Sequence, residues 1–345
     1  MSIKFLCVTL PHMSITEPDV TLRKEGETLV AVHGDGQKDR IPLHLLEQII
    51  SFSGAAVSPA VMDACVNRGI GFSALSQRGR LRFRVSGSTT GNVLLRKRQY
   101  LLSDQDRRYL AAKLLHEKLA GQRSVLSRFR RNHPAVQTDV FEASEKAIRE
   151  LEKRLDEAES VDEMRGIEGR AARRYFDAFG AMILAEDSAF RFEERSRQPP
   201  LDRCNAMLSF GYTLLAGDCT QALESIGLDP QAGILHGDRP GKSALAFDMM
   251  ETFRAPMVDR HVLRMINLRM ISVEMFEDGA ENGVFLNADG RKCYLKEWNH
   301  MRQQKVMIPE LGQHVPRGLI LHLQAARLAS YLRGDTSTCD LIQWG

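Results

Sequence analysis

The chain has 345 residues, of which 43% are hydrophobic and 26% are charged, a composition typical of globular proteins large enough for two domains. The formal net charge is only +3, so total charge does not indicate a nucleic-acid-binding protein, and such a function must rest on where the charges lie. The six cysteines form no CxxC pair, which leaves a zinc ribbon unsupported, and no apolar stretch reaches the roughly 20 residues that span a bilayer. Without a recognisable signal peptide, these features predict a cytoplasmic protein with reduced thiols and no membrane segment.

The first 85 residues carry the patterns of β structure. Short apolar or alternating runs, separated by turn-forming segments, predict strands at residues 3–10, 20–23, 28–33, 39–42, 70–75 and 81–85. We expect the early strands of this series to pair in antiparallel order. One helix is predicted at residues 58–69, with Ser58 as the N-cap, Pro59 in the first turn and Gly69 at the end.

From residue 92 onward the apolar residues take up helical spacing. Helices are predicted at residues 92–102, 105–131, 140–157, 169–179, 205–216, 243–253, 256–276 and 315–332. A Gly-rich break predicts a short hairpin with strands at 283–286 and 292–295. The sequence therefore predicts an α+β protein: a small β-rich domain at 1–85, a linker at 86–91, and a larger, mostly α-helical domain at 92–345.

A cluster of basic residues lies around the predicted linker. Seven basic residues stand there with no acidic residue between them: Arg78, Arg80, Arg82, Arg84, Arg96, Lys97 and Arg98. Because Arg80, Arg82 and Arg84 alternate with apolar residues, they share one face of a strand, and planar guanidinium groups at that spacing suit DNA phosphates. The alternative is a solvated strand face, which the mutual repulsion of so many unneutralised cations disfavours.

The helical region offers a first candidate for chemistry at Glu168. This acid lies between Gly166 and Gly169 at the predicted start of a helix, and Arg170 and Arg173 follow it. Glycines at this place bring the backbone close to whatever the carboxylate holds, and the arginines add positive charge nearby. The alternative is an acid that only stabilises a helix N-terminus.

Two further candidates follow along the chain. An apolar run delivers His236 into a loop rich in glycine and proline, a setting in which functional residues often lie but in which a lone histidine is more often structural. Asp248 and Glu251 are three residues apart in an otherwise apolar segment, so on a helix they share a face. Buried carboxylates are costly unless they are paired or bound to metal, and Arg254 and Arg260 are the alternative partners.

Taken together, carboxylate oxygens and one imidazole suit Mg²⁺ or Mn²⁺, and no nearby cysteine points to zinc. A divalent ion of this kind polarises a phosphodiester and activates the attacking hydroxyl. The candidate ligands and catalytic residues are Glu168, His236, Asp248 and Glu251.

The motifs around these residues resemble the CRISPR-associated endonuclease/integrase family, the spacer-acquisition integrase. Their residue pattern is most similar to that of the type I-C branch. The matching segments are Gly-Ile-Glu-Gly at Glu168, Leu-His-Gly-Asp-Arg-Pro-Gly-Lys at His236, Asp-Met-Met-Glu-Thr-Phe-Arg at 248–254, and segments 42–46, 58–62, 91–100, 205–212 and 324–335. They span essentially the whole chain in the family's order.

The resemblance implies an N-terminal β domain that forms a homodimer and a helical domain that holds the metal. It places ligands at Glu168, His236 and Glu251, with Asp248 as an acidic neighbour. Many relatives have Asp where this chain has Glu251, which leaves open whether Asp248 or Glu251 contacts the metal. The implied function is CRISPR adaptation: the 3′-hydroxyl ends of a prespacer duplex attack the CRISPR repeat, with a small ferredoxin-like partner nuclease that joins two dimers in a heterohexamer.

We expect two groups of basic residues to hold double-stranded DNA in this reaction. Arg170, Arg173, Arg239 and Lys242 are expected near the scissile phosphate. The residues expected to follow the prespacer farther out are Arg80, Arg82, Arg84, Arg96 and Arg98. Two other functions fit the same residues: a plain metal-dependent nuclease, and a non-catalytic DNA-binding scaffold whose acids and histidine are merely paired in the core.

Overall fold

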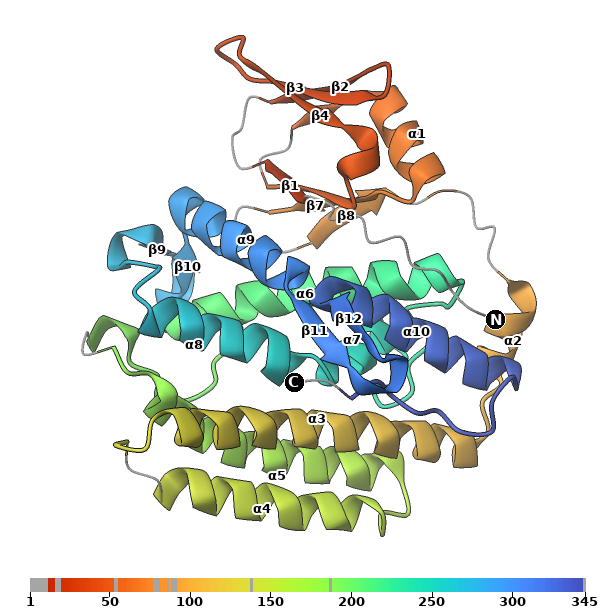
Figure 1. The fold of residues 1–345 in the computed structure, drawn as a ribbon, viewed down its shortest axis with the longest axis vertical. Coiled ribbons are helices and arrows are strands. Elements are labelled where there is room, and N and C mark those ends of the chain that lie inside the picture. Colours follow the sequence, from red (N-terminus) through yellow and green to blue (C-terminus); the bar gives the residue numbers. More distant parts are fainter. Residues whose placement is uncertain are drawn as a thin grey trace. The chain divides into compact units, whose positions relative to one another are not determined.

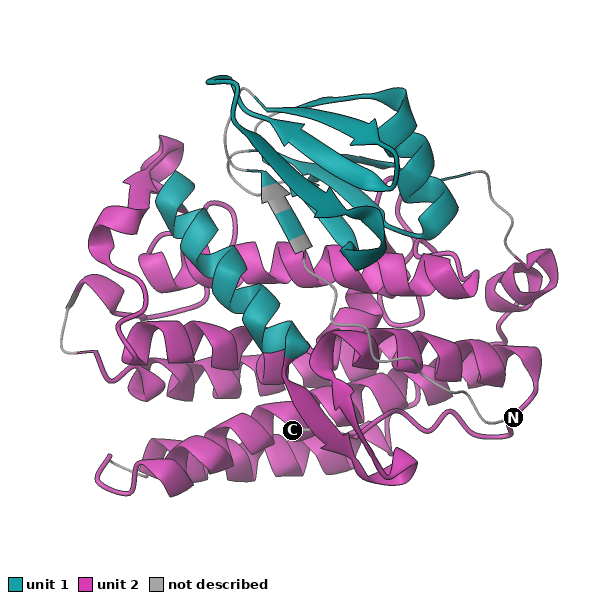
Figure 2. Ribbon diagram, turned by 45° about the horizontal axis from the view of Figure 1, so that its top comes forward, with its two compact units in different colours: residues 1–89, 286–303 teal, residues 90–285, 304–345 magenta. Residues whose placement is uncertain are grey.

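The computed structural model describes residues 12–15, 20–52, 55–76, 81–85, 87, 92–136, 139–185 and 188–343. The chain divides into two compact units, residues 1–89 with 286–303 and residues 90–285 with 304–345 (Figure 2). The strand predicted at 3–10 and most of the linker predicted at 86–91 lie outside the described residues. Within the described ranges, no helix combines the length and the apolar character that crossing a bilayer requires.

The first unit contains two four-stranded sheets (Figure 1). The strands of one sheet, in spatial order, are β1 (His12–Ile15), β5 (Gln48–Ser51), β7 (Gly71–Leu75) and β8 (Leu81–Val85). Those of the other are β4 (Lys38–Pro42), β3 (Thr28–Val32), β2 (Thr21–Glu25) and β6 (Ala56–Val57). The antiparallel pairing of β2, β3 and β4 confirms the prediction, whereas β1, β5 and β6, which pair in parallel with their neighbours, were not foreseen.

The core of this unit lies between the sheets and helix α1 (Pro59–Arg68). Leu22, Leu29, Ile49 and Val61 are fully buried in one apolar cluster. Removing such side chains from water is the main source of stability for so small a unit. Helix α9 (Ala288–Gln303) also belongs to this unit by its contacts, although in sequence it lies between segments of the helical unit.

Both ends of α1 follow the sequence prediction in position. Gly69 ends the helix with φ 68°, in the left-handed region that a glycine adopts without strain. Ser58 stands at the N-cap, but its side chain makes no capping hydrogen bond, so Pro59 at the first helical position is the feature that favours the start.

The second unit is mainly helical, as predicted. Its principal helices are α2 (Val93–Tyr100), α3 (Asp104–Asn132), α4 (Asp139–Leu155), α5 (Val161–Phe179), α6 (Arg203–Ile226), α7 (Ala244–Glu251), α8 (Arg260–Asn267) and α10 (Arg317–Arg333). Helices α3, α4 and α5 pack on one another, and α6 packs against α7 and α10 (Figure 1).

Helix α5 begins at Val161 rather than at residue 169, which corrects the predicted boundary. The Ser160 hydroxyl accepts a hydrogen bond from the Glu163 amide and so caps the helix start. Glu168 therefore lies inside a helix and not at its N-terminus, and the two neighbouring glycines do not begin the helix.

Two other predicted boundaries are also wrong. The segment predicted as one helix at 256–276 is a π-helical stretch, Arg254–Asp259, followed by α8, which ends at Asn267. Residues 292–295, predicted as a hairpin strand, lie inside α9, and the partner of β10 (Val284–Leu286) is β9 (Phe276–Asp278). A second hairpin, β11 (Lys305–Ile308) with β12 (Gln313–Pro316), was not predicted.

Candidate functional site

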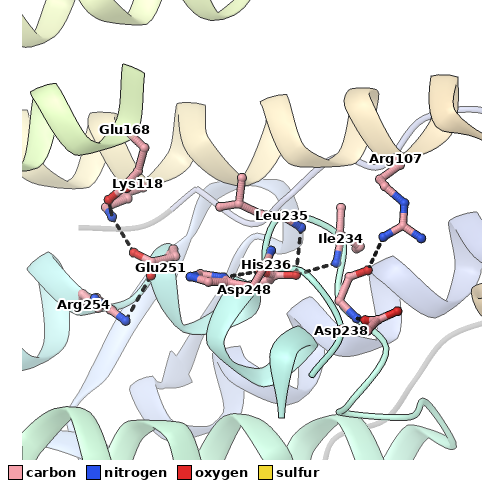
Figure 3. A network of polar contacts seen from close by, with 11 residues as sticks. Arg107, Lys118, Glu168, Ile234, Leu235, His236, Asp238, Asp248, Glu251 and Arg254 are labelled. Carbon is pink, nitrogen blue, oxygen red and sulfur yellow. Dashed lines mark hydrogen bonds and ion pairs between the residues drawn. The ribbon is translucent and has the colours of Figure 1, made fainter. Parts of the chain in front are cut away.

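The second unit brings the predicted catalytic residues together (Figure 3). Glu168 comes from α5, His236 from the loop after α6, and Asp248 and Glu251 from α7. Lys118 of α3 joins them and was missed by the sequence analysis. Its signal was nevertheless present, because it occupies a position on the mostly apolar stripe of α3 that faces the core.

Asp248 fixes the loop that carries His236. Its Oδ2 accepts hydrogen bonds from the amides of Ile234 at 2.6 Å and Leu235 at 3.0 Å, and its Oδ1 accepts one from the His236 amide at 2.9 Å. Oδ1 also lies 2.5 Å from the His236 Nδ1 atom. The Asp248 carboxylate is fully buried, and these contacts are the compensation that a buried carboxylate requires.

The same loop needs glycine at position 233. A Cβ atom on Gly233 would lie 2.3 Å from the His236 carbonyl oxygen and 2.7 Å from the Ala244 Cβ atom. The Gly233 amide donates to Asp238 Oδ1 at 2.8 Å, and its carbonyl accepts from Arg107 Nη1 at 2.7 Å (Figure 3). These contacts hold the loop in a compact conformation. The His236 side chain nevertheless remains 43% exposed.

Glu251 is held between two cations. Its Oε1 atom lies 3.0 Å from Arg254 Nη2, and its Oε2 atom lies 2.5 Å from Lys118 Nζ. Burial alone would raise the pKa of the Glu251 carboxyl, but Arg254, Lys118 and His236 outweigh it and lower that pKa to about 2. Glu251 is therefore ionised throughout the physiological range, and its pairing with Arg254 was one of the two alternatives weighed from the sequence.

Lys118 also contacts the Glu168 carboxylate, so a single ammonium bridges two glutamates (Figure 3). The Glu168 side chain is 26% exposed and that of Glu251 only 4%. Gly121, about one turn after Lys118, lies where α3 packs closely on the Arg254–Asp259 stretch, because a Cβ atom there would lie 3.3 Å from Pro256 Cδ.

These groups fit the chemistry of a divalent cation. Two glutamates face one cationic group, and the His236 ring lies between Asp248 and Glu251 in Figure 3. An imidazole held by a carboxylate through one nitrogen and free at the other is the common arrangement of a metal-binding histidine. Within the described ranges no three His, Cys, Asp or Glu side chains converge closely enough to hold an ion. Lys118 stands between the two glutamates instead.

A second layer of aromatic and charged groups supports Arg254. Its guanidinium lies 4.9 Å from the centre of the Tyr212 ring, and the Tyr212 hydroxyl donates to Asp259 Oδ1 at 2.6 Å. Arg195 stacks on the same ring at 5.3 Å. Burial raises the pKa of the Asp259 carboxyl to about 6, although Tyr212 and the two arginines act in the opposite direction.

The basic residues predicted around the linker have separate positions. Arg82 and Arg84 lie two apart on β8, whereas Arg80 lies outside the described residues. Arg96 Nε donates to the carbonyl of Gly227, the residue that ends α6, and Arg98 Nη1 lies 3.5 Å from the Leu332 carbonyl near the end of α10. Arg96 and Arg98 therefore stabilise helix C-termini, a role that the sequence analysis did not foresee.

Arg170 and Arg173 line a groove between α4 and α5. The groove encloses about 840 Å³ and is lined by Ala147, Glu150, Leu151, Arg154, Gly166, Gly169, Arg170, Arg173 and Arg174. Because Arg170 follows Glu168 by two residues, it points about 200° around the helix from that acid. Arg239 and Lys242 are exposed in the loop after His236, where the Lys242 amide donates to the Arg239 carbonyl.

Comparisons with known proteins agree with this fold. The family model described as CRISPR associated protein Cas1 matches residues 13–300. A CRISPR-associated endonuclease Cas1 of Rhodospirillum rubrum is 43% identical over 326 residues, which cover 93% of this chain and 94% of the relative.

Two solved structures share the fold. One is a casposase bound to an integration product, with a TM-score of 0.85, 22% identity, and coverage of 96% of this chain and 93% of that one. The other is a chain of a Cas6-RT-Cas1–Cas2 complex, with a TM-score of 0.79, 20% identity, and coverage of 99% of this chain and 37% of that one. From the family match and the sequence identity together, the chain belongs to the Cas1 family of CRISPR-associated endonucleases, the integrases of CRISPR adaptation.

Proposed function

We propose that this Cas1 protein joins prespacer DNA to the CRISPR repeat with a divalent metal ion, Mg²⁺ or Mn²⁺, held by Glu168, His236 and Glu251. The observation that carries the proposal is that one ammonium, that of Lys118, contacts both the Glu168 and the Glu251 carboxylates, while Asp248, on the same helix as Glu251, holds the His236 imidazole. A bound ion of this kind supplies Lewis acidity, which stabilises the negative charge that grows on the phosphate oxygens during in-line attack by the 3′-hydroxyl.

The protein's own residues prepare the site for this ion. In the proposed tautomer His236 donates from Nδ1 to Asp248, which leaves the lone pair of Nε2 available as a ligand. Asp248 acts as a positioning residue because both of its oxygens are already engaged by the loop. Glu251 Oε2 is the carboxylate oxygen offered to the metal, since Arg254 holds Oε1.

Two groups of basic residues are proposed to hold the DNA backbone. Arg239 and Lys242 lie in the exposed loop that follows His236, and Arg170 and Arg173 line the groove between α4 and α5. The groove carries four arginines against one glutamate, a balance that favours phosphate over a neutral ligand. Such contacts set the position of DNA with little sequence preference.

The outer contacts are proposed for the strand and linker region. Their members are Arg80, Arg82, Arg84, Arg96 and Arg98. Arg96 and Arg98 already donate to helix carbonyls. They would therefore bind DNA through the guanidinium N–H groups that these bonds do not use.

The proposed assembly is a homodimer that joins a small ferredoxin-like partner nuclease in a heterohexamer. The structural neighbour in a Cas6-RT-Cas1–Cas2 complex supports a Cas2-type partner, and the casposase bound to an integration product supports an integration reaction, for which double-stranded DNA is the proposed substrate. Membership of the type I-C branch rests on the sequence motifs alone. The cytoplasm is the proposed location, since an enzyme that modifies the CRISPR array acts where that DNA lies.

A strand-transfer assay tests the proposal. Purified protein with its partner nuclease, a prespacer duplex, repeat DNA and Mn²⁺ should yield joined products. Glu168→Ala, His236→Ala and Glu251→Gln should each abolish transfer and leave duplex binding largely intact. Glu163→Ala is the matched control, because this exposed acid lies in the first turn of α5, away from the site.

The outcomes separate the alternatives. Full transfer by Glu168→Ala in Mn²⁺ would refute the metal site. Cleavage of free DNA ends without joined products, by wild-type protein, would favour a plain nuclease. DNA binding with neither reaction, and without any stabilisation by Mn²⁺, would favour a scaffold.

A further inference from the structure

Lys118 is a buried lysine that the proposed reaction does not use. Its side chain is 6% exposed, and it lies on the core-facing stripe of α3. Burying an ammonium is costly unless it is paired, and Lys118 is paired with two carboxylates, those of Glu168 and Glu251.

The oxygens that Lys118 holds are the ones that a metal needs. Arg254 occupies Glu251 Oε1 at 3.0 Å, so Oε2 is the oxygen left for another cation, and Lys118 Nζ lies 2.5 Å from it. On Glu168 the ammonium contacts Oε1. An ion and the ammonium therefore compete for Glu251 Oε2 and for the space between the two carboxylates.

The charge balance of the site also indicates that a divalent ion and the Lys118 ammonium exclude each other. Lys118 and Arg254 balance Glu168 and Glu251, so this group of four is neutral as it stands. A divalent cation added beside both would leave an excess of two positive charges within a few ångströms. Arg254 is fixed by its stacking on Tyr212, whereas the lysine stem has four rotatable methylenes and can swing away.

We propose that Lys118 is the internal counter-ion of the metal site: its ammonium holds Glu168 and Glu251 together in the metal-free protein and leaves them when a divalent ion binds. This inference rests on the proposed metal-dependent function. Lys118 is accordingly a positioning residue that preserves the geometry of the site before loading and lowers its affinity for metal.

The test is Mn²⁺ binding by wild-type protein and Lys118→Met, measured by isothermal titration and by thermal melting with and without Mn²⁺. Without metal, Lys118→Met should melt at a lower temperature, because Glu168 loses its contact with the ammonium and Glu251 keeps only Arg254. Its Kd for Mn²⁺ should be lower than that of wild type by roughly tenfold, since no ammonium has to be displaced. Saturating Mn²⁺ should reverse most of the decrease in the melting temperature of Lys118→Met.

Lys113→Met is the matched control. Lys113 lies on the same helix over the Tyr109 ring, away from both glutamates, and its removal should leave the Mn²⁺ affinity unchanged. If Lys118→Met does not fold without metal, Lys118→Gln replaces it, because it removes the charge and keeps a hydrogen-bonding group. The same tightening is expected for that variant.

Two results are decisive against the inference. Wild-type protein that binds Mn²⁺ no more weakly than the Lys118 variants overturns the counter-ion role and leaves the proposed function standing. Wild-type protein that binds no Mn²⁺ at all overturns both.

Discussion

The Asp248 carboxylate lies 2.5 Å from His236 Nδ1 and also accepts the His236 amide, so one buried side chain sets both the imidazole and the backbone that carries it. With the amides of Ile234 and Leu235 included, Asp248 accepts from three consecutive backbone groups. A carboxylate on α7 thereby does for this loop what a capping residue does for a helix start.

Asp248→Asn should cost stability and activity together. An asparagine amide turns one of the two acceptors into a donor that faces backbone N–H groups, and leaves buried amides unsatisfied. We expect a loss of about 2–4 kcal/mol in the free energy of unfolding and loss of strand transfer. Urea denaturation and the transfer assay measure the two effects.

Asp238→Asn provides the matched comparison. Asp238 accepts one amide in the same loop through Oδ1, which asparagine retains, and it is exposed. The free energy of unfolding of Asp238→Asn should stay within about 0.5 kcal/mol of that of wild type. Equal losses from the two substitutions would contradict the role assigned to Asp248.

Gly233→Ala should disrupt the site without touching a ligand. The added methyl would meet the His236 carbonyl at 2.3 Å, so the loop must move and take the imidazole with it. We expect the free energy of unfolding to fall by about 1–3 kcal/mol and strand transfer to be greatly reduced. Gly237→Ala, in the same loop but with open space around its Cβ, should behave like wild type in denaturation and in the transfer assay.

The sequence was sufficient to predict the β-to-helical order and most helices, because apolar spacing and turn residues are local signals. The parallel strands β1 and β5 escaped prediction, since their pairing depends on distant contacts. Residues 292–295 show a different limit: this short segment was interpreted as a hairpin strand, whereas Tyr294 packs on Trp298 about one turn later in a helix.

The four predicted site residues do come from elements that meet, but their partners were only partly predictable. Pairing of Glu251 with Arg254 follows from helical spacing. The contact of Lys118 with Glu168 and Glu251 joins three separate helices, and no periodicity within one segment can reveal it. Glu168 and Arg170 point to nearly opposite sides of α5. The sequence analysis missed this because it began the helix at residue 169 and so left Glu168 outside it.

Asp259 makes stability depend on pH in a defined direction. Burial raises its pKa to about 6, against 3.8 for the ordinary group, so the folded protein binds this proton more tightly than the unfolded chain. The stability gained from the protonated form is present below about pH 4 and is lost as pH rises through 6. Asp259→Asn has no such proton. The stability of wild type relative to Asp259→Asn should therefore fall between pH 4 and 7, by at most about 3 kcal/mol.

Guanidinium denaturation of both proteins across this pH range checks the expectation. Comparing the two proteins cancels the titration of the other carboxyl groups. A difference that is constant or that grows in favour of wild type with rising pH would show that Asp259 is ionised in the fold at low pH.

The groove between α4 and α5 gives a prediction about DNA binding that is independent of the metal. Arg170 and Arg173 are exposed and line it, so Arg170→Gln with Arg173→Gln should leave thermal stability nearly unchanged. If each arginine neutralises one phosphate, the slope of log K against log salt should become less steep by about 2. Fluorescence anisotropy with a prespacer duplex over a range of salt concentrations measures it. Arg165→Gln, on the same helix but paired with Asp162, should leave the slope unchanged. Because Arg170 points away from Glu168, an unaltered slope in the double variant would mean that DNA reaches the site along another face.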